Sequence, residues 1–320
     1  MDGIRTRVTE QLGIRYPIVQ GGLARVAKAE LCAAVSAAGG LGQIATAGLA
    51  GAEELRAEIR KVRAATDKPF GVNFPLGRMD ITAMLEVTLE EKVPVIALTA
   101  GNPAPWIKRI NGAAKTLVLI AGPELAKKAE AAGADMVATV GFEGGGHIGR
   151  SDETSLVMIP RVVRAVSIPV LASGGFANGE GLLAALSLGA EGVEMGTRFV
   201  ATAEAHAHPN YKQALVEAGP GRTMIIKRTL GMPGRVLDSA YAKNVLARET
   251  AGAPSEEIVP LIAGTVNAIG TDEGRMEESF VWAGQCVGLI DEVLPAGEVV
   301  ARMAAEAKAG MKRLSNAFAD

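Results

Sequence analysis

The stretch IPVLASGGFANGEGLLAALSLGAEGVEMGTRF, residues 168–199, contains two short apolar runs separated by a glycine pair and a segment of helix-forming residues. IPVLAS and GVEM have the length of buried strands, and GEGLLAALSLG has the periodicity of a helix. A buried run, a helical segment and a second buried run are typical of βα units in a parallel sheet. The stretch therefore predicts a strand, a helix and the next strand of such a sheet.

The same pattern recurs along the first two thirds of the chain. Eight apolar runs end in small residues, and helical segments such as AEELRAEIRKVRAAT separate them. The runs are residues 17–22, 40–46, 70–74, 93–101, 116–122, 136–146, 168–175 and 192–199. Eight successive units fit a closed barrel better than an open doubly wound sheet, which usually has fewer strands. The predicted fold class is therefore α/β, a (β/α)8 TIM barrel.

The pattern changes after about residue 203. Three segments there have helical periodicity, and the glycine-rich stretches GPGRTM (219–224) and LGMPGRV (230–236) between them are predicted as loops. We expect residues 204–294 to form an additional helical cap near the C-terminus that covers the substrate. Residues 1–203 and 295–320, the latter with a returning helix, would form the barrel. The alternative is that these helices only decorate the last barrel helix.

Composition excludes several classes of protein. The 320 residues are 48% hydrophobic, and 33 Lys and Arg balance 35 Asp and Glu to a net charge of -2, which argues against nucleic acid or a membrane surface as a partner. No run of 18 apolar residues and no N-terminal apolar segment is present, so we expect a cytoplasmic protein. Cys32 and Cys286 are far apart, and His206 and His208 lack a third ligand nearby, so no metal site is expected.

Glycines gather where the predicted strands end. In a barrel of this kind the active site lies on the loops that follow the strands. Gly174 and Gly175 follow the seventh strand, and Gly196 and Thr197 end the eighth. Backbone N–H groups without side chains in the way can bind an anion there, so these loops predict a phosphate site.

Two further features suggest which phosphorylated group binds. Gly21 and Gly22 after the first strand would let a flat ring approach the backbone, and Asn73 offers both a donor and an acceptor to its edge. A flat heteroaromatic ring with a phosphate tail is FMN, whereas NAD(P)H alone would more often use a GxGxxG motif. His147 follows three consecutive glycines at a strand end, which favours a functional histidine over one buried in the core.

The motifs PIVQGG (17–22), FGVN (70–73), GFEGGGHIG (141–149), SGGFANG (173–179) and MGTRF (195–199) occur in this order over nearly the whole predicted barrel. Together they resemble the nitronate monooxygenase (2-nitropropane dioxygenase) family of FMN-dependent barrels, which includes NADH:quinone reductases and flavin-type enoyl-acyl-carrier-protein reductases. The resemblance implies that His147 is the catalytic histidine over the flavin ring. It also implies that the remaining cofactor contacts come from Gly21, Gly22, Leu23, Asn73, Gly145, Gly146, Ser173, Gly174, Gly175, Gly196 and Thr197.

Several reactions remain open at this point. The first hypothesis is an FMN-dependent oxidoreductase with a small-molecule substrate, either oxidising alkyl nitronates with O2 or passing hydride from NADH or NADPH to a quinone. Lys227, Arg228 and Arg235 are candidates for a nucleotide phosphate, or they are solvated cap residues. An enoyl-acyl-carrier-protein reductase, with acyl carrier protein as its partner, is the alternative. A barrel that binds a phosphate ligand without redox chemistry belongs to another class. The apolar SFVWAGQCVGLI (279–290) would form a homodimer contact or cover the barrel.

Overall fold

Eight parallel strands form the centre of the computed structural model, which describes residues 3–77 and 80–319. Along the sheet they run β1, β9, β8, β6, β5, β4, β3, β2, and a parallel bridge between Val19 and Leu41 links the two ends. The strands are β1 (Ile18–Gln20), β2 (Gln43–Ala45), β3 (Gly71–Pro75), β4 (Val95–Thr99), β5 (Lys115–Ile120), β6 (Met136–Val140), β8 (Val170–Ser173) and β9 (Val193–Met195). Each overlaps one of the eight predicted runs, and only β3 and β5 extend beyond theirs, by one residue each, so the (β/α)8 TIM barrel is confirmed.

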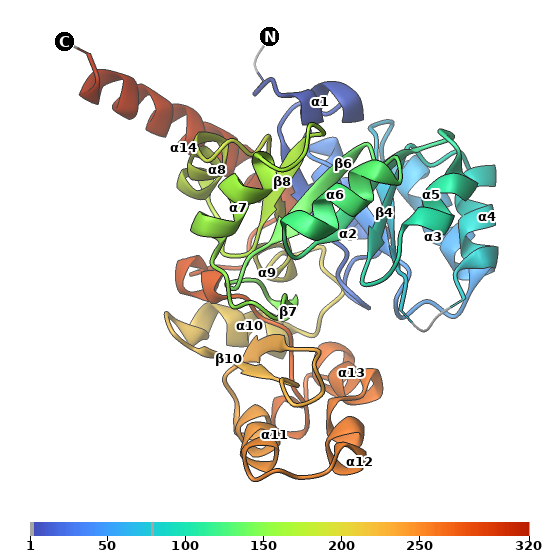
Figure 1. Ribbon diagram of the computed structural model, residues 1–320, viewed down its shortest axis with the longest axis vertical. Coiled ribbons are helices and arrows are strands. Elements are labelled where there is room, and N and C mark those ends of the chain that lie inside the picture. Colours follow the sequence, from blue (N-terminus) through green and yellow to red (C-terminus); the bar gives the residue numbers. More distant parts are fainter. Residues whose placement is uncertain (1–2, 78–79, 320) are drawn as a thin grey trace.

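Helices cover the outside of this barrel (Figure 1). They are α2 (Ala29–Ala37), α3 (Ala52–Ala65), α4 (Thr82–Glu90), α5 (Ala104–Ile110), α6 (Pro123–Ala131), α7 (Ser155–Val163), α8 (Gly179–Ser187) and the C-terminal α14 (Ala296–Ala317). Helix α14 packs against α8 and α2, and its Val300 and Met303 join Leu182 of α8 in one buried cluster. The chain thus returns to the barrel at its end, as the sequence predicts.

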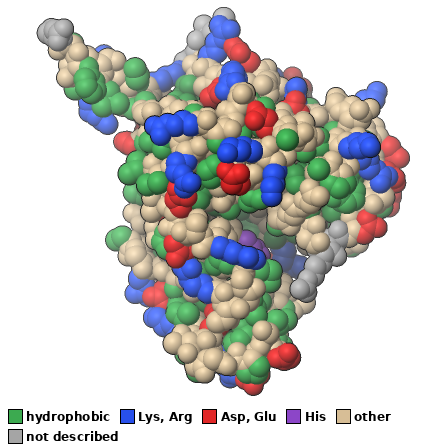
Figure 2. Space-filling view, in the orientation of Figure 1, with side chains coloured by type: hydrophobic (Ala, Val, Ile, Leu, Met, Phe, Trp, Pro, Cys, Tyr) green, Lys and Arg blue, Asp and Glu red, His purple; other side chains and the backbone are tan. Residues whose placement is uncertain are grey.

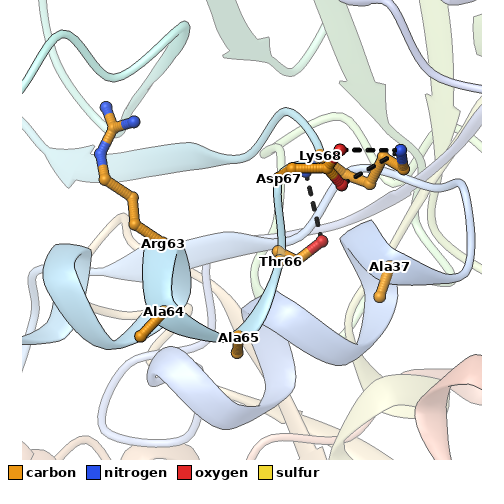
Figure 3. A pocket seen from close by; sticks show the side chains of 7 residues that line it. All are labelled: Ala37, Arg63, Ala64, Ala65, Thr66, Asp67 and Lys68. Carbon is orange, nitrogen blue, oxygen red and sulfur yellow. Dashed lines mark hydrogen bonds and ion pairs between the residues drawn. The ribbon is translucent and has the colours of Figure 1, made fainter.

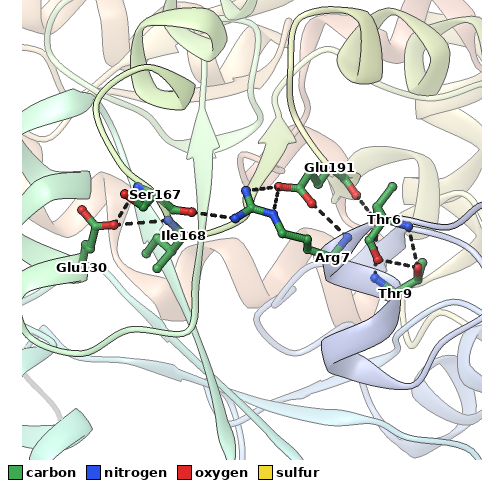
Figure 4. Close-up of polar contacts among 7 residues, drawn as sticks. All are labelled: Thr6, Arg7, Thr9, Glu130, Ser167, Ile168 and Glu191. Atoms are coloured by element: carbon green, nitrogen blue, oxygen red, sulfur yellow. Dashed lines mark hydrogen bonds and ion pairs between the residues drawn. The ribbon is translucent and has the colours of Figure 1, made fainter.

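The amino end of the barrel is closed by α1 (Arg7–Leu12), whose Val8 and Leu12 join the apolar barrel interior. Polar contacts hold this helix to the loops before β8 and β9 (Figure 4). The backbone N–H and the guanidinium of Arg7 donate to the Glu191 carboxylate, and Arg7 Nη1 donates to the Ser167 carbonyl at 2.7 Å. Because this end is sealed, the opposite end, where the strands terminate, is the open one.

The elements between residues 204 and 294 lie at that open end, and most of them form the lower lobe of Figure 1. They are α10 (Pro209–Ala218), β10 (Thr223–Ile226), β11 (Gly234–Leu237), α11 (Ala240–Thr250), α12 (Ser255–Ile258), α13 (Gly264–Glu273) and three 3-10 turns, η1 (Val259–Ile262), η2 (Met276–Glu278) and η3 (Gln285–Leu289). A short helix, α9 (Thr197–Val200), precedes them. The division into a barrel and a cap at 204 and 294 remains a prediction.

The prediction of loops at 219–224 and 230–236 is wrong in part. Strands β10 and β11 pair antiparallel there, and β11 also pairs with β7 (Gly146–His147) in a three-stranded sheet. Each strand has only four residues, and glycine or proline lies close by in the sequence. The alternation of apolar and polar side chains that marks a strand is therefore too short to recognise. Pairing with β7 and burial of Val236 stabilise these strands, and both depend on residues distant in the sequence.

The apolar segment 279–290 packs inside the chain itself. Phe280, Val281 and Val287 are each at most 2% exposed, whereas Leu289 is exposed. Packing against the chain's own core, rather than a homodimer contact, therefore accounts for most of the apolar side chains in this segment. Within the described residues, no helix is both long enough and apolar enough to cross a membrane.

Candidate functional site

His147 lies between the barrel and the lower lobe because β7 leaves the barrel and joins the small sheet. Its register partner is Gly234 of β11, and Gly146 pairs with Arg235. Gly146 has a φ of +78°, a conformation that side chains rarely adopt, so glycine is required immediately before the histidine. Figure 2 shows histidine atoms at a hollow between the two parts, with Lys or Arg side chains beside them.

A lysine from the lower lobe contacts this histidine. Lys227 Nζ lies 2.6 Å from His147 Nε2, although the two residues are 80 positions apart in the chain. Lys227 is only 4% exposed, and its backbone N–H donates to Glu249 Oε2 at 2.7 Å. The Trp282 ring lies against both groups, 5.1 Å from the imidazole centroid and 5.4 Å from Lys227 Nζ. The Trp282 ring and the Glu249 carboxylate therefore help to hold the pair in place.

These surroundings determine the charge of the histidine. His147 is reachable from solvent on its open side, but the protein removes water from its other sides. This desolvation, together with the nearby Lys227 ammonium, lowers the pKa of His147 to about 4. Burial also lowers the pKa of Lys227. Because an ammonium only donates hydrogen bonds, Nε2 accepts from Lys227 and the proton of the neutral imidazole is on Nδ1.

The loops after β8 and β9 present backbone amides without side chains. Gly174 and Gly175 have φ values of +92° and +93°, so a substitution at either position strains the backbone. Within the part of the chain that the structure describes, the N–H groups of Gly174, Gly175 and Gly196 donate to no protein backbone or side-chain acceptor. Gly196 leads directly into α9, and Thr197 Oγ1 accepts from the Gly284 N–H at 2.9 Å. These amides are suited to bind an anion.

The N-terminus of α8 is not part of this cradle. The Gly179 N–H donates to Glu306 Oε2 of α14 at 2.7 Å, and the Gly181 N–H donates to Asn178 Oδ1 at 3.0 Å. A carboxylate therefore already occupies the position that an anion would take at this helix. The phosphate site predicted here must use the loop amides instead, and Ser173 at the end of β8 lies beside them.

Close packing explains part of the glycine run before His147. A Cβ on Gly145 would lie 2.5 Å from the Gly284 nitrogen, and one on Gly144 would lie 2.7 Å from Val140 Cγ1. Contacts under 3.0 Å force a backbone or side-chain shift. Space for a cofactor is thus not the only reason for these glycines, and their contact with one is a proposal.

The residues predicted at the end of β1 meet Asn73 of β3. A Cβ on Gly22 would lie 2.1 Å from Asn73 Cγ, so the amide lies directly against bare backbone. Asn73 is 5% exposed, and among the described residues its Nδ2 has no hydrogen-bond partner. Leu23 is partly buried and packs near Gly196, which brings the ends of β1 and β9 together. A buried donor without an acceptor fits a ligand that supplies one.

Glu194 was not predicted from the sequence as a functional residue, and Lys227 was predicted only as a candidate for a nucleotide phosphate. Glu194 of β9 is 2% exposed, and burial raises its pKa to about 7. Its neighbour is Gln43 of β2, whose Nε2 lies 3.4 Å from Glu194 Oε1. A carboxylate within an apolar strand, VEM at 193–195, was the available signal. No pattern in the sequence could indicate that Lys227 contacts His147.

The other cations near His147 already have partners. The buried Arg235 donates to the Phe142 carbonyl at 2.9 Å and to Thr223 Oγ1 at 3.2 Å. Arg228 forms an exposed ion pair with Asp152 at 3.0 Å. Both cysteines are buried. Among residues 3–77 and 80–319, no three His, Cys, Asp or Glu side chains lie close enough together to hold a metal ion.

A surface pocket of about 420 Å³ lies elsewhere, lined by Ala37 and residues 63–68 (Figure 3). It follows the end of α3 and precedes β3, so it lies at the amino ends of the strands. Its lining consists of alanines and exposed polar side chains, with an ion pair between Asp67 and Lys68. It is separate from the loops that carry His147 and the strand-end glycines.

A parallel barrel with unpaired backbone amides and a histidine beside a lysine at its open end has the features expected of a barrel enzyme with its active site on the strand-end loops. The sequence profile of the family described as nitronate monooxygenase matches residues 5–84 and 77–306. The chain therefore belongs to the nitronate monooxygenase family, and it is a flavin-dependent oxidoreductase.

Individual relatives carry different names. A "(3aS,4S,5R,7aS)-5-hydroxy-7a-methyl-1-oxo-octahydro-1H-indene-4-carboxyl-CoA dehydrogenase" of Mycobacterium tuberculosis is 41% identical over 238 residues, which cover 73% of this chain and 66%, just under two thirds, of that protein. A nitronate monooxygenase of Pseudomonas aeruginosa is 33% identical over 94% of this chain and 98% of its own length. The structure of FabK from Thermotoga maritima has a TM-score of 0.93 and 39% identity, covering 98% of this chain and 100% of FabK.

Proposed function

We propose that the chain is an FMN-dependent oxidoreductase that passes hydride from NADH or NADPH to an acceptor with a conjugated carbonyl, preferably an acyl thioester. The observation that carries this proposal is the 2.6 Å contact between Lys227 Nζ and His147 Nε2. FMN would supply the chemistry by accepting and donating hydride at its ring. The protein's task is then to bind the acceptor and stabilise the negative charge that develops on its oxygen.

The His147–Lys227 pair suits that task better than proton abstraction. A general base needs a free lone pair and a pKa near the working pH. The Nε2 lone pair of His147 accepts from Lys227, and the pKa of the imidazole is about 4. Its Nδ1–H remains a donor, and the adjacent ammonium increases the positive potential there. A preorganised donor beside a cation stabilises an oxyanion in a site that excludes water.

The choice of a thioester is supported by two relatives. The Mycobacterium tuberculosis protein at 41% identity is named as a dehydrogenase of a carboxyl-CoA compound. The FabK structure at 39% identity resembles the chain over nearly its whole length. A quinone would place its charge on oxygen in the same way, so it is the other acceptor that this pair would serve.

The second candidate reaction is oxidation of an alkyl nitronate with O2. A nitronate is already an anion, so it needs no base, and the Lys227 ammonium beside His147 would favour its binding. The Pseudomonas aeruginosa relative named nitronate monooxygenase supports this candidate. An uncharged nitroalkane is a poorer candidate, because its oxidation begins with removal of a proton.

The residues at the open end fit FMN. The unpaired N–H groups of Gly174, Gly175 and Gly196, with Ser173 and Thr197 beside them, would hold its phosphate. Gly21, Gly22 and Leu23 would lie against the ring, and Asn73 Nδ2 would donate to its polar edge. Gly145 and Gly146 would border the cofactor beside His147. The imidazole of His147 would then orient a small-molecule acceptor.

Anaerobic mixing of the FMN-loaded protein with NADH, NADPH and ethyl nitronate tests the proposal. We expect a nicotinamide nucleotide to bleach the flavin fastest, and a 2-enoyl-CoA or a quinone to restore its colour. Lys227→Met should slow this reoxidation at least tenfold, whereas Lys243→Met, at an ion pair on α11, should not. Faster bleaching by the nitronate would favour the second candidate. A protein that binds no FMN would refute both.

A further inference from the structure

Glu194 occupies an unusual position inside the mouth of the barrel. In the register of the sheet it lies beside Val19 of β1 and Ser173 of β8, at the level where the strands end. Its neighbours on β9, Val193 and Met195, pack in the cluster outside the barrel, so Glu194 points into the interior. The carboxyl is 2% exposed.

The groups that face this carboxyl are neutral. From β2, the Gln43 amide approaches Oε1 at 3.4 Å, and Gln43 itself is fully buried. From the end of β1, the bare backbone of Gly21 faces it, since a Cβ there would lie 3.3 Å from Glu194 Oε1. Among the described residues no charged side chain contributes to the pKa of Glu194, which burial raises to about 7. An isolated buried carboxylate is costly, so the group favours its neutral form.

Gln43 can form a hydrogen bond with the Glu194 carboxyl whether that carboxyl is ionised or protonated. Its Nε2 lies 3.4 Å from Glu194 Oε1 and can donate to an ionised carboxylate. Its Oε1 is buried and has no partner among the described residues. A rotation of the amide by half a turn would let this oxygen accept from a protonated carboxyl. The neighbour of Glu194 is thus a side chain that suits both the loss and the gain of a proton.

We propose that Glu194 holds a proton at the flavin site and exchanges it with solvent when the flavin changes its redox state. This inference rests on the proposed function, because FMN over Gly21 and Gly22 would lie next to the carboxyl. It assigns a role to a residue outside the His147–Lys227 pair, on the barrel side of the site. Glu194 acts through the cofactor and does not touch the acceptor.

Protons and electrons balance over one cycle of flavin reduction and reoxidation. Hydride from the nicotinamide would bring two electrons and one proton to FMN, so the reduced cofactor would carry one negative charge more than the oxidised one. A carboxylate beside it is then disfavoured by the like charge, so an ionised Glu194 takes up one proton from solvent. Transfer of the hydride to the acceptor would remove this charge, and Glu194 would then return its proton to solvent. Where Glu194 is already protonated, no extra proton moves.

Titration of the bound, oxidised flavin tests this role without turnover. We expect the visible absorption of the FMN-loaded protein to titrate with a midpoint near pH 7, as Glu194 ionises. Glu194→Gln should abolish this titration, whereas Glu180→Gln, an exposed carboxyl on α8, should keep it. Proton uptake on anaerobic reduction at pH 8, measured with an indicator dye, should fall by about one proton per flavin in Glu194→Gln only.

A wild-type spectrum that is constant from pH 5 to 9, or a titration that persists in Glu194→Gln, would overturn the inference. If Glu194→Gln loses its flavin, Gln43→Leu provides the test, because loss of the amide donor should move the midpoint to higher pH. An unchanged midpoint in that variant would also overturn it. A wild-type protein that binds no FMN contradicts the proposed function, whereas FMN binding without titration contradicts only the role of Glu194.

Discussion

Replacing Glu194 with glutamine should stabilise the protein at neutral and alkaline pH. The pKa of this carboxyl rises on folding from an ordinary value of 4.5 to about 7, because the barrel removes it from water. The folded state therefore binds the proton more tightly than the unfolded state, and folding loses stability as the pH rises from about 4.5 to 7. At 1.36 kcal/mol per pH unit, this difference corresponds to about 3 kcal/mol.

Glutamine has the same shape and carries no charge, so the variant should not lose this stability. Thermal unfolding of the cofactor-free protein between pH 4.5 and 8 is a suitable assay. An unfolding entropy of about 2.1 cal/mol/K per residue corresponds to about 0.7 kcal/mol per degree for a chain of this length. The variant should therefore melt roughly 4 °C above the wild type at pH 8, and the difference should nearly vanish at pH 4.5.

The comparison isolates one group because all other titrating residues are shared by both proteins. Glu180→Gln, on the exposed surface of α8, should show no such dependence on pH. A melting difference that is the same at pH 4.5 and pH 8 would refute the reasoning, and so would a wild type that is more stable than the variant at pH 8. Either result would mean that the buried carboxylate is stabilised by a partner other than Gln43.

Three further predictions concern the site and the thiols. Lys227→Met should raise the pKa of His147 from about 4, but the pKa should stay below its ordinary value because desolvation remains. NMR titration of the imidazole would measure this pKa, and an unchanged value would contradict the pairing with Lys227. Gly22→Ala should weaken FMN binding at least tenfold and destabilise the fold by about 1–3 kcal/mol, because the alanine Cβ would lie 2.1 Å from Asn73 Cγ. Fluorescence titration would measure the binding of FMN, and urea unfolding would measure the stability. Neither cysteine should react with a thiol reagent at pH 8 until urea is added, because both thiols are buried and burial raises their pKa values. Rapid labelling of the native protein would contradict this prediction.

The barrel could be predicted from the sequence because each of its strands is encoded locally. A buried run such as residues 168–173 is apolar whatever it pairs with, and the helical segment after it has its own periodicity. The strand-end glycines were predictable for a similar reason, since parallel strands in succession bring their carboxyl ends to one edge. The structure places Gly174 and Gly196 directly after β8 and β9, whereas Asn73 lies within β3, two residues before its end.

The features that were missed depend on residues distant in the chain. Strands β10 and β11 are short, and only their pairing with each other and with β7 distinguishes them from loops. Lys227 is one cation among many in the sequence, and its approach to His147 follows from the path of that hairpin. Glu194 sits in an apolar strand, but the sequence does not show which face of the strand it occupies or that Gln43 lies opposite.

Because β7 pairs with β11, the backbone of His147 belongs to the small sheet of the lower lobe. His147 in β7 and Lys227 directly after β10 both belong to the small three-stranded sheet, whereas the glycine amides that would hold the cofactor phosphate follow strands of the barrel. A tilt of the lobe would withdraw the donor and its cation together, with their mutual distance preserved. Such a movement would also shift Gly146, which borders the proposed cofactor site, whereas Gly174, Gly175 and Gly196 would stay with the barrel.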